Sequence, residues 1–198
     1  MNASTEKKIL ESLMARLKQE SSSEHDRMEI LMRKSGTFES KENYAQFTLS
    51  QYYFQKDVEN LYLDPKVQQL IPDLDVRGRS EAALQDLKDL GIEPQQQIIA
   101  TETVGFPESL GWIYVSEGST LGAAFLFKEA QAKFGFNAEF AARNLAAYPE
   151  GRAVVWKRFK QTLDEANFTE QEKNDVIKGA LSGFRRFGEL LEDFKDLK

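Results

Sequence analysis

Cysteine is absent from this chain of 198 residues, and histidine occurs once, at position 25. The lack of cysteine excludes disulfides, thiolate metal ligands and a thiol nucleophile. A single histidine excludes zinc sites built on several imidazoles, and it excludes the paired Glu-x-x-His motifs of di-iron helical proteins. Any Ser-His-Asp triad would have to use His25. The chain therefore offers one imidazole and no thiol.

Long hydrophobic runs and a surplus of positive charge are also missing. The longest apolar stretch, GWIYVSEGSTLGAAFLF at 111–127, is interrupted by Glu117 and hydroxyl residues well short of the roughly 20 apolar residues that a membrane helix needs. The N-terminal segment has charges throughout and lacks the apolar core of a secretory signal, so we expect a cytoplasmic protein. The formal net charge of -6 argues against nucleic-acid binding. We expect neither a membrane nor a nucleic acid as partner.

Apolar residues recur every three or four positions along nearly the whole chain, which predicts helices rather than strands. The last predicted helix begins with the capping-box pattern Thr169-x-x-Glu172. A hydrophobic content of 41% in a chain of this length is enough for one core, so we predict a single all-α domain over residues 1–198. Residues 96–104 could be extended. The predicted helices cover about residues 5–19, 22–34, 41–62, 66–71, 79–90, 107–133, 137–146, 149–165 and 169–194.

A protein with one imidazole can bind a metal when a macrocycle supplies the other ligands, as in haem held by one proximal histidine. His25 follows a helix-starting SSS sequence, and Met28 and Met32 lie on the same helical face as a soft, apolar surface. Glu29, one turn after His25, could hydrogen-bond the second imidazole nitrogen and fix its orientation. A lone histidine on a helix is also typical of a solvated or core-edge residue, and both interpretations are open on these features.

Glycines at positions 111, 118 and 122 interrupt the long predicted helix. Each costs about 1 kcal/mol relative to alanine in a helix interior. Gly118 and Gly122 are one turn apart beside Ser119, so one helical face has almost no side-chain volume. A planar ligand could lie there, but close helix packing or a kink would give the same pattern. Gly111 has no explanation in the sequence. We expect three neighbours in the core, namely Trp112, Val115 and Phe125.

Together, EHDRMEILMRKSGTF and ESLGWIYVSEGSTLGAAFLFKEA resemble the proximal and distal haem helices of the bacterial heme oxygenases. The resemblance covers most of the chain, including YAQFTLSQYYFQKDVENLY and GFRRFGELLEDF. It implies a single-domain helical bundle with haem between a proximal and a kinked distal helix. It further implies that His25 is the iron ligand, with Glu29 as its hydrogen-bonding partner. The distal, catalytic face implied by the resemblance is formed by Gly118, Ser119 and Gly122.

Lys18 stands seven residues before His25, which in a continuous helix is two turns, roughly 10 Å, on nearly the same face. It could therefore reach a haem propionate. The resemblance implies that Tyr114 binds the other propionate, and that this Lys–Tyr pair accompanies cleavage at the α-meso carbon. The weaker candidates for haem contact, for which a solvated surface role is as good an interpretation, are Arg33, Lys128 and Arg185.

The resemblance implies a heme oxygenase, in which haem is cofactor and substrate together. O2 and electrons would convert haem to biliverdin IXα, CO and Fe2+, with iron acquisition from haem as the expected purpose. No G-x-G-x-x-G follows a strand and cysteine is absent, so we expect an external electron donor, a reductase or a ferredoxin. We also expect a monomeric enzyme. The alternatives are a non-catalytic haem carrier or sensor, and a non-haem binding protein. Candidates for a basic donor-docking patch are Lys18, Arg33, Lys34, Lys128, Arg185 and Arg186.

Overall fold

The computed structural model describes residues 12–146 and 148–193, and its regular elements in these ranges are helices, which confirms the all-α prediction. The single domain over residues 1–198 stays a prediction, because both ends of that range lie outside the described part. The α-helices are α2 (Leu13–Glu20), α3 (Ser22–Lys34), α4 (Lys41–Asn60), α5 (Pro65–Leu70), α6 (Ser80–Asp89), α7 (Ser109–Phe134), α8 (Arg152–Glu165) and α9 (Glu170–Asp193), with 3-10 turns η1 (Leu61–Leu63) and η2 (Leu74–Val76).

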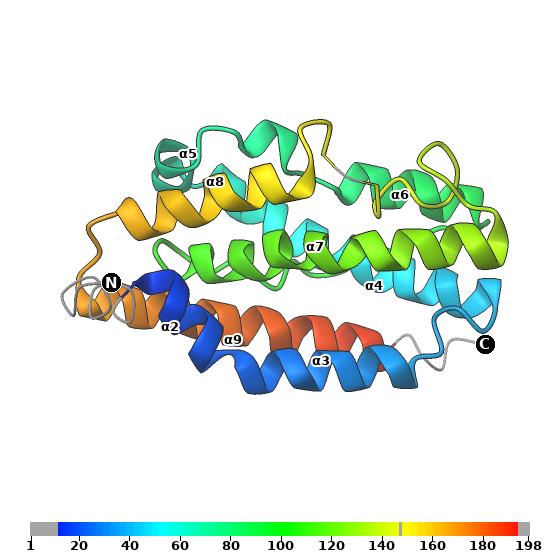
Figure 1. Cartoon of the computed structure of the whole chain (residues 1–198), viewed down its shortest axis with the longest axis horizontal. Helices are drawn as coiled ribbons and strands as arrows, with labels where there is room; N and C mark the ends of the chain where they lie inside the picture. Colours follow the sequence, from blue (N-terminus) through cyan, green and yellow to red (C-terminus); the bar gives the residue numbers. More distant parts are fainter. Residues whose placement is uncertain (1–11, 147, 194–198) are drawn as a thin grey trace, which may run out of the picture.

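Helix α7 runs through the middle of the molecule (Figure 1), with α5, α6 and α8 on one side and α2, α3 and α9 on the other. Helix α9 packs against α3, α4 and α7. Its apolar stripe supplies Val176, Ala180 and Phe184 to the core, because residues three or four apart share one helical face. The predicted capping box is confirmed, since the Thr169 amide donates to Glu172 at 2.8 Å and the Glu172 amide donates to Thr169 Oγ1 at 3.2 Å.

Gly111 of α7 lies where α7 crosses α9. A Cβ atom on Gly111 would lie 2.0 Å from the carbonyl oxygen of Val176, and one on Gly179 would lie 1.9 Å from that of Glu108. No side chain fits at either position. The glycine that had no explanation in the sequence therefore permits close approach of two helix backbones.

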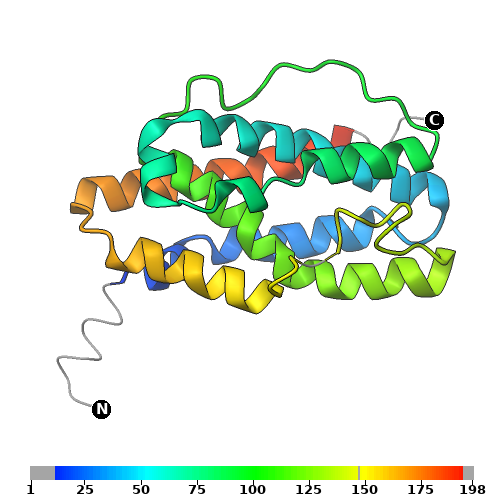
Figure 2. The same cartoon turned by 90° about the horizontal axis from the view of Figure 1, so that it is seen from above.

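The predicted helix over 137–146 is wrong, because this segment folds as turns with isolated bridges at Asn137. Carboxylates of α6 accept its backbone N–H groups: Asp89 accepts from Ala141 at 2.9 Å, and Asp86 accepts from Asn144 at 2.8 Å. These bonds replace the hydrogen bonds of a helix, and Ala141, Ala142 and Leu145 are still buried. Residues 92–99 form a loop without regular structure, which arches over one side of the molecule in Figure 2.

The predicted N-terminal helix over 5–19 is described only from Leu13, since residues 5–11 lie outside the described part. The side chain of Ser12 caps α2 by accepting the amide hydrogen of Ala15 at 3.1 Å. Helix α2 ends at Glu20 and α3 begins at Ser22, so the chain is not one continuous helix from Lys18 to His25. The spacing argument that placed both residues on one helical face is therefore wrong.

Candidate functional site

The imidazole of His25 lies on the surface of α3, with 62% of the side chain exposed. Its Nδ1 atom is 3.6 Å from Oε1 of Glu29, one turn later. The ring meets Phe184 of α9 edge-on, with 6.4 Å between ring centroids. Within the described ranges, no protein group hydrogen-bonds Nε2. This nitrogen is therefore available to an external ligand while Nδ1 faces a carboxylate.

The glycines in the middle of α7 differ from Gly111 in their surroundings. A Cβ atom on Gly122 would meet nothing within 4 Å, and one on Gly118 would meet only the ring of Trp156, at 3.7 Å. Ser119 and Gly122 are exposed. Close packing of a second helix therefore does not explain these glycines. Helix α7 bends near its middle, where its two halves run in different directions in Figure 2.

Helix α9 packs against both helices that carry candidate residues, α3 and α7. Phe184 of α9 contacts His25, and the neighbouring Gly183 lies against Trp112 and Val115 of α7. Trp112 and Val115 are buried as expected, whereas the expectation for Phe125 is wrong, since 76% of it is exposed. Phe125 lies on α7, and its ring faces solvent.

Tyr114 lies against the junction between α2 and α3. Burial raises the pKa of its phenol, and the neighbouring Ser21 hydroxyl opposes this shift. Ser21 itself donates to the Leu17 carbonyl at 2.7 Å. Lys18, which is exposed, precedes Ser21 by three residues, so both predicted propionate partners lie near the α2–α3 junction.

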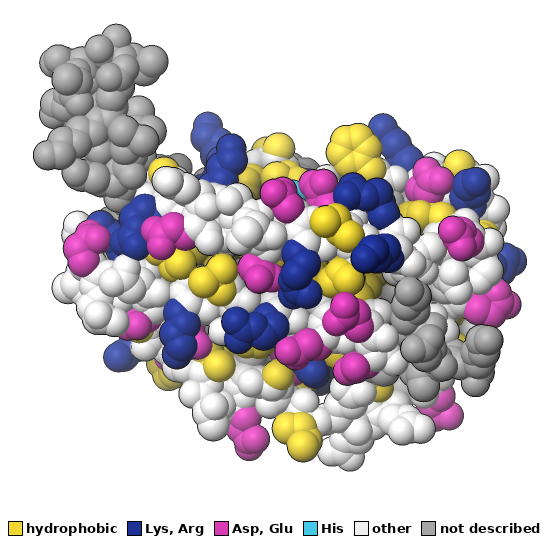
Figure 3. All heavy atoms as spheres, turned by 90° about the horizontal axis from the view of Figure 1, so that it is seen from below, with side chains coloured by type: hydrophobic (Ala, Val, Ile, Leu, Met, Phe, Trp, Pro, Cys, Tyr) yellow, Lys and Arg dark blue, Asp and Glu magenta, His cyan; other side chains and the backbone are white. Residues whose placement is uncertain are grey.

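The other predicted cations are distributed over three helices. Arg33 on α3 lies 3.8 Å from Glu29, while Lys128 on α7 and Arg185 on α9 are exposed. Arg186 does not belong to a docking patch, because it donates to the buried carboxylate of Asp57 at 2.9 Å. On the face shown in Figure 3, Lys and Arg side chains are interspersed with acidic and hydrophobic ones.

Three arginines contact α7, and their contacts were not predicted from the sequence. Arg79 donates to the Ser116 carbonyl at 2.9 Å and approaches Ser119 Oγ at 3.4 Å, and Ser119 Oγ donates to the Ser116 carbonyl at 2.6 Å. Arg152 donates to the Thr120 carbonyl at 2.6 Å. The third is Arg77, which forms an ion pair with Glu117 of α7. Charged residues are usually exposed, so nothing in the local sequence distinguished these arginines from surface residues.

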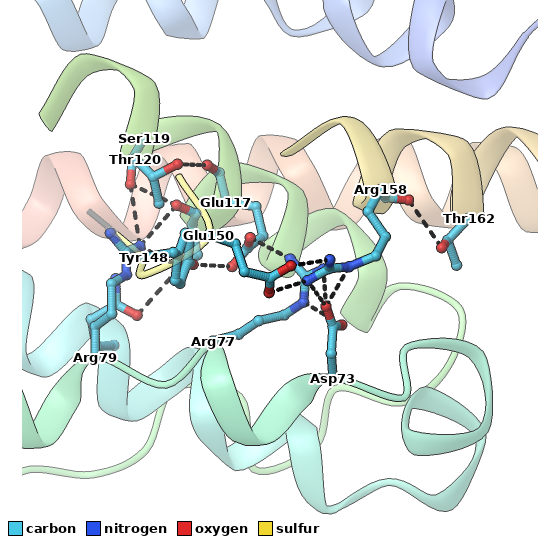
Figure 4. Close-up of polar contacts among 12 residues, drawn as sticks. Asp73, Arg77, Arg79, Glu117, Ser119, Thr120, Tyr148, Glu150, Arg158 and Thr162 are labelled. Atoms are coloured by element: carbon cyan, nitrogen blue, oxygen red, sulfur yellow. Dashed lines mark hydrogen bonds and ion pairs between the residues drawn. The ribbon is translucent and has the colours of Figure 1, made fainter. Parts of the chain in front are cut away.

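Glu117, which directly precedes Gly118, is completely buried. It forms an ion pair with Arg77, and Tyr148 donates to its Oε1 at 2.9 Å (Figure 4). Burial lowers the pKa of Arg77, but its bonds to Asp73 and Glu117 outweigh burial and raise that pKa overall. The sequence showed Glu117 only as an interruption of an apolar stretch.

Within the described residues, no three His, Asp or Glu side chains are placed to bind a metal ion together. No helix there combines the length and apolar composition needed to cross a bilayer.

Comparisons with known proteins agree on one family. The heme oxygenase family model matches residues 11–193. The chain is 44% identical over 170 residues to heme oxygenase PigA of Pseudomonas aeruginosa, covering 85% of each protein. Its structure matches the NO- and CO-bound heme oxygenase of Neisseria meningitidis with a TM-score of 0.87 and 37% identity, over 95% of this chain and 94% of that one. A heme oxygenase of Leptospira interrogans, 19% identical with a TM-score of 0.77 over 92% of this chain and 99% of that one, shares the fold.

Proposed function

The chain belongs to the heme oxygenase family of haem-degrading enzymes, and we propose that it opens haem at the α-meso carbon to give biliverdin IXα, CO and Fe2+. Haem is both substrate and prosthetic group in this family. The observation that carries the proposal is the open, side-chain-free surface at Gly118 and Gly122, together with the unpartnered Nε2 of His25. Helix α9 packs against α3 and α7, the two helices that carry these residues.

These residues fit a haem held between α3 and α7. When bound, haem supplies the iron that activates O2 and the macrocycle that is oxidised. In the proposal, Nε2 of His25 ligates the iron, and Glu29 orients the imidazole by accepting from Nδ1. Gly118 and Gly122 let a flat macrocycle approach the backbone of α7, and Ser119 supplies a hydroxyl beside it.

The proposed α-meso selectivity depends on how the propionates are held. Tyr114 faces the α2–α3 junction and Lys18 lies one turn before it, so both can anchor propionates at one end of the site. A fixed propionate end determines which meso carbon lies beneath the distal segment 118–122. Arg33, Lys128 and Arg185 are further proposed contacts of haem, since all three are exposed cations.

Electrons are proposed to come from an external reductase or ferredoxin. The cations available for docking are Lys18, Arg33, Lys34, Lys128 and Arg185, without the core-bound Arg186. Because acidic residues are interspersed with cations on the face in Figure 3, docking would depend on individual charge pairs more than on a uniform positive field. The monomeric state, the cytoplasmic location and a role in iron acquisition stay predictions.

Adding hemin and a reducing system to the protein tests the proposal. The Soret band should disappear as the broad red absorption of biliverdin grows, with release of CO, and chromatography should identify the IXα isomer. An intact haem spectrum after many electron equivalents would contradict turnover and support a haem carrier or sensor. Unchanged hemin affinity in His25→Ala would instead contradict the assignment of the iron ligand.

A further inference from the structure

The buried carboxylate of Glu117 occupies an unusual position for a structural ion pair. It lies on α7, one residue before Gly118, and none of it is exposed. Buried ion pairs are rarely more stabilising than apolar side chains of the same volume, because both charges lose their hydration. Stability alone therefore does not explain a glutamate at this position, whereas a role in fixing the position of the α7 backbone does.

Glu117 is one end of a chain of charged contacts that we call the charge brace (Figure 4). Arg77 joins Glu117 to Asp73, with 2.8 Å between Arg77 Nε and Asp73 Oδ1. Asp73 in turn accepts from Nε of Arg158 on α8 at 2.8 Å. The brace ends at the surface, where Arg158 meets Glu150 at 2.9 Å. It ties α7 to the segment before η2, to α8 and to the loop between α7 and α8.

The inner part of the brace leaves little freedom to move. The guanidinium of Arg77, 1% exposed, also lies over the ring of Phe159, at 5.5 Å from the centroid. Tyr148 holds the second carboxylate oxygen of Glu117. Charge-assisted hydrogen bonds of this kind are short and directional, so they specify the position of the carboxylate more closely than apolar packing does.

We propose that Glu117 is a positioning residue, which acts through Arg77 and Tyr148 to hold the backbone of residues 118–122 at one fixed height over the haem. This inference rests on the proposed haem site and deepens it. The open glycines have no side chains to hold them in place, so the restraint must come from the residues that flank them. With the inner contacts of Glu117 to Arg77 and Tyr148 broken, the distal segment would adopt several positions above the macrocycle.

Three variants test the brace. Glu117→Gln keeps the shape and a hydrogen bond to Tyr148 but removes the negative charge. Tyr148→Phe removes one hydrogen bond of Glu117 and creates no unpaired buried charge. It therefore tests the same proposal if Glu117→Gln fails to fold. Glu117→Gln with Arg77→Met removes both charges and should recover the unfolding temperature. The control is Glu150→Gln, which makes the same chemical change at the exposed end of the brace.

Two measurements do not depend on turnover. Hydrogen exchange of the amides at 118–124 in haem-free protein should be faster in Glu117→Gln by on the order of tenfold, the effect of losing a charge-assisted hydrogen bond. In the ferrous CO complex, the C–O stretching band should split or broaden in Glu117→Gln. Tyr148→Phe should show smaller changes in the same direction, and the control should match the wild type.

The double variant separates positioning from stability. Its unfolding temperature should recover, but fast exchange and the broadened band should remain, because the ion pair that fixes residue 117 is absent from the double variant. Recovery of all three properties would overturn the proposal, as would a wild-type band and exchange rate in Glu117→Gln. If His25→Ala bound hemin as tightly as the wild type, the proposed haem site would be wrong and this inference with it. A well-bound wild-type haem with an unaffected Glu117→Gln would overturn only the inference.

Discussion

Gly111 of α7 and Gly179 of α9 let two helix backbones cross so closely that a Cβ on either would lie within about 2 Å of a carbonyl oxygen of the other helix. Gly122, three turns along the same helix, faces open space. Two glycines of one helix therefore have opposite surroundings, and this difference separates a packing role from a binding role.

Gly122→Ala should stabilise the haem-free protein and weaken haem binding. The added methyl group meets no protein atom, so the helix gains about 1 kcal/mol from the replacement, or roughly 2–4 °C in unfolding temperature. The same methyl group would occupy the surface proposed for the macrocycle. Because the methyl group and the macrocycle would then clash, hemin affinity should fall by on the order of tenfold or more. Calorimetry and hemin titration measure both effects.

Gly111→Ala is the matched control for that substitution. It should lower the unfolding temperature sharply, because α7 and α9 would have to separate to admit the Cβ. A Gly122→Ala protein that binds hemin as tightly as the wild type would contradict the haem assignment of this face.

Removing the carboxylate beside His25 should weaken the proposed iron ligation without abolishing it. Glu29 lies 3.6 Å from Nδ1, and partners of this kind typically change metal affinity or activity 10- to 100-fold, so Glu29→Ala should reduce hemin affinity by about that factor. Absorption titration with hemin measures it. Asp26→Ala, an exposed carboxylate on the same helix, should have no such effect. Equal losses in both variants would indicate a general charge effect.

Loss of both proposed propionate partners should broaden the product distribution. With Lys18→Ala and Tyr114→Phe combined, haem should take more than one in-plane orientation, and chromatography should separate a mixture of biliverdin isomers. Each single variant should give a smaller proportion of other isomers. Pure α product from the double variant would show that other groups seat the haem.

Asp73 should make the folded state sensitive to acid. Burial raises the pKa of its carboxyl, but the bonds to Arg77 and Arg158 outweigh burial and hold that pKa below the ordinary 3.8. The folded state therefore binds this proton more weakly than the unfolded state. The stabilising contribution is complete above pH 3.8 and is lost as the pH falls through the lowered pKa.

Denaturant unfolding at a series of acid pH values measures this contribution. The free energy of unfolding should fall less steeply below pH 3.8 in Asp73→Asn than in the wild type. Arg158→Met, which removes one of the two cations, should give an intermediate slope. Identical slopes in all three proteins would contradict the role of the Asp73 ion pairs.

Most helices could be predicted from the sequence because their signals are local. Apolar spacing and caps such as Thr169 act within one or two turns, and the helices form where those signals occur. The segment 137–146 has the same apolar spacing, yet its amides bond to Asp86 and Asp89, 52 or more residues away. No local pattern reveals that competition.

The sequence by itself limited the class of chemistry: one histidine and no cysteine are compatible with haem held by a single imidazole, and the resemblance of the segments around His25 and Gly118 to the heme oxygenases indicated haem. Only the tertiary structure decided which glycines pack and which stay open, because Gly111 and Gly122 differ in what lies opposite them. It also decided that Arg77 and Glu117, 40 residues apart, share one buried ion pair. Burial depends on the whole fold, and a charged residue has the same local sequence signature at the surface as in the core.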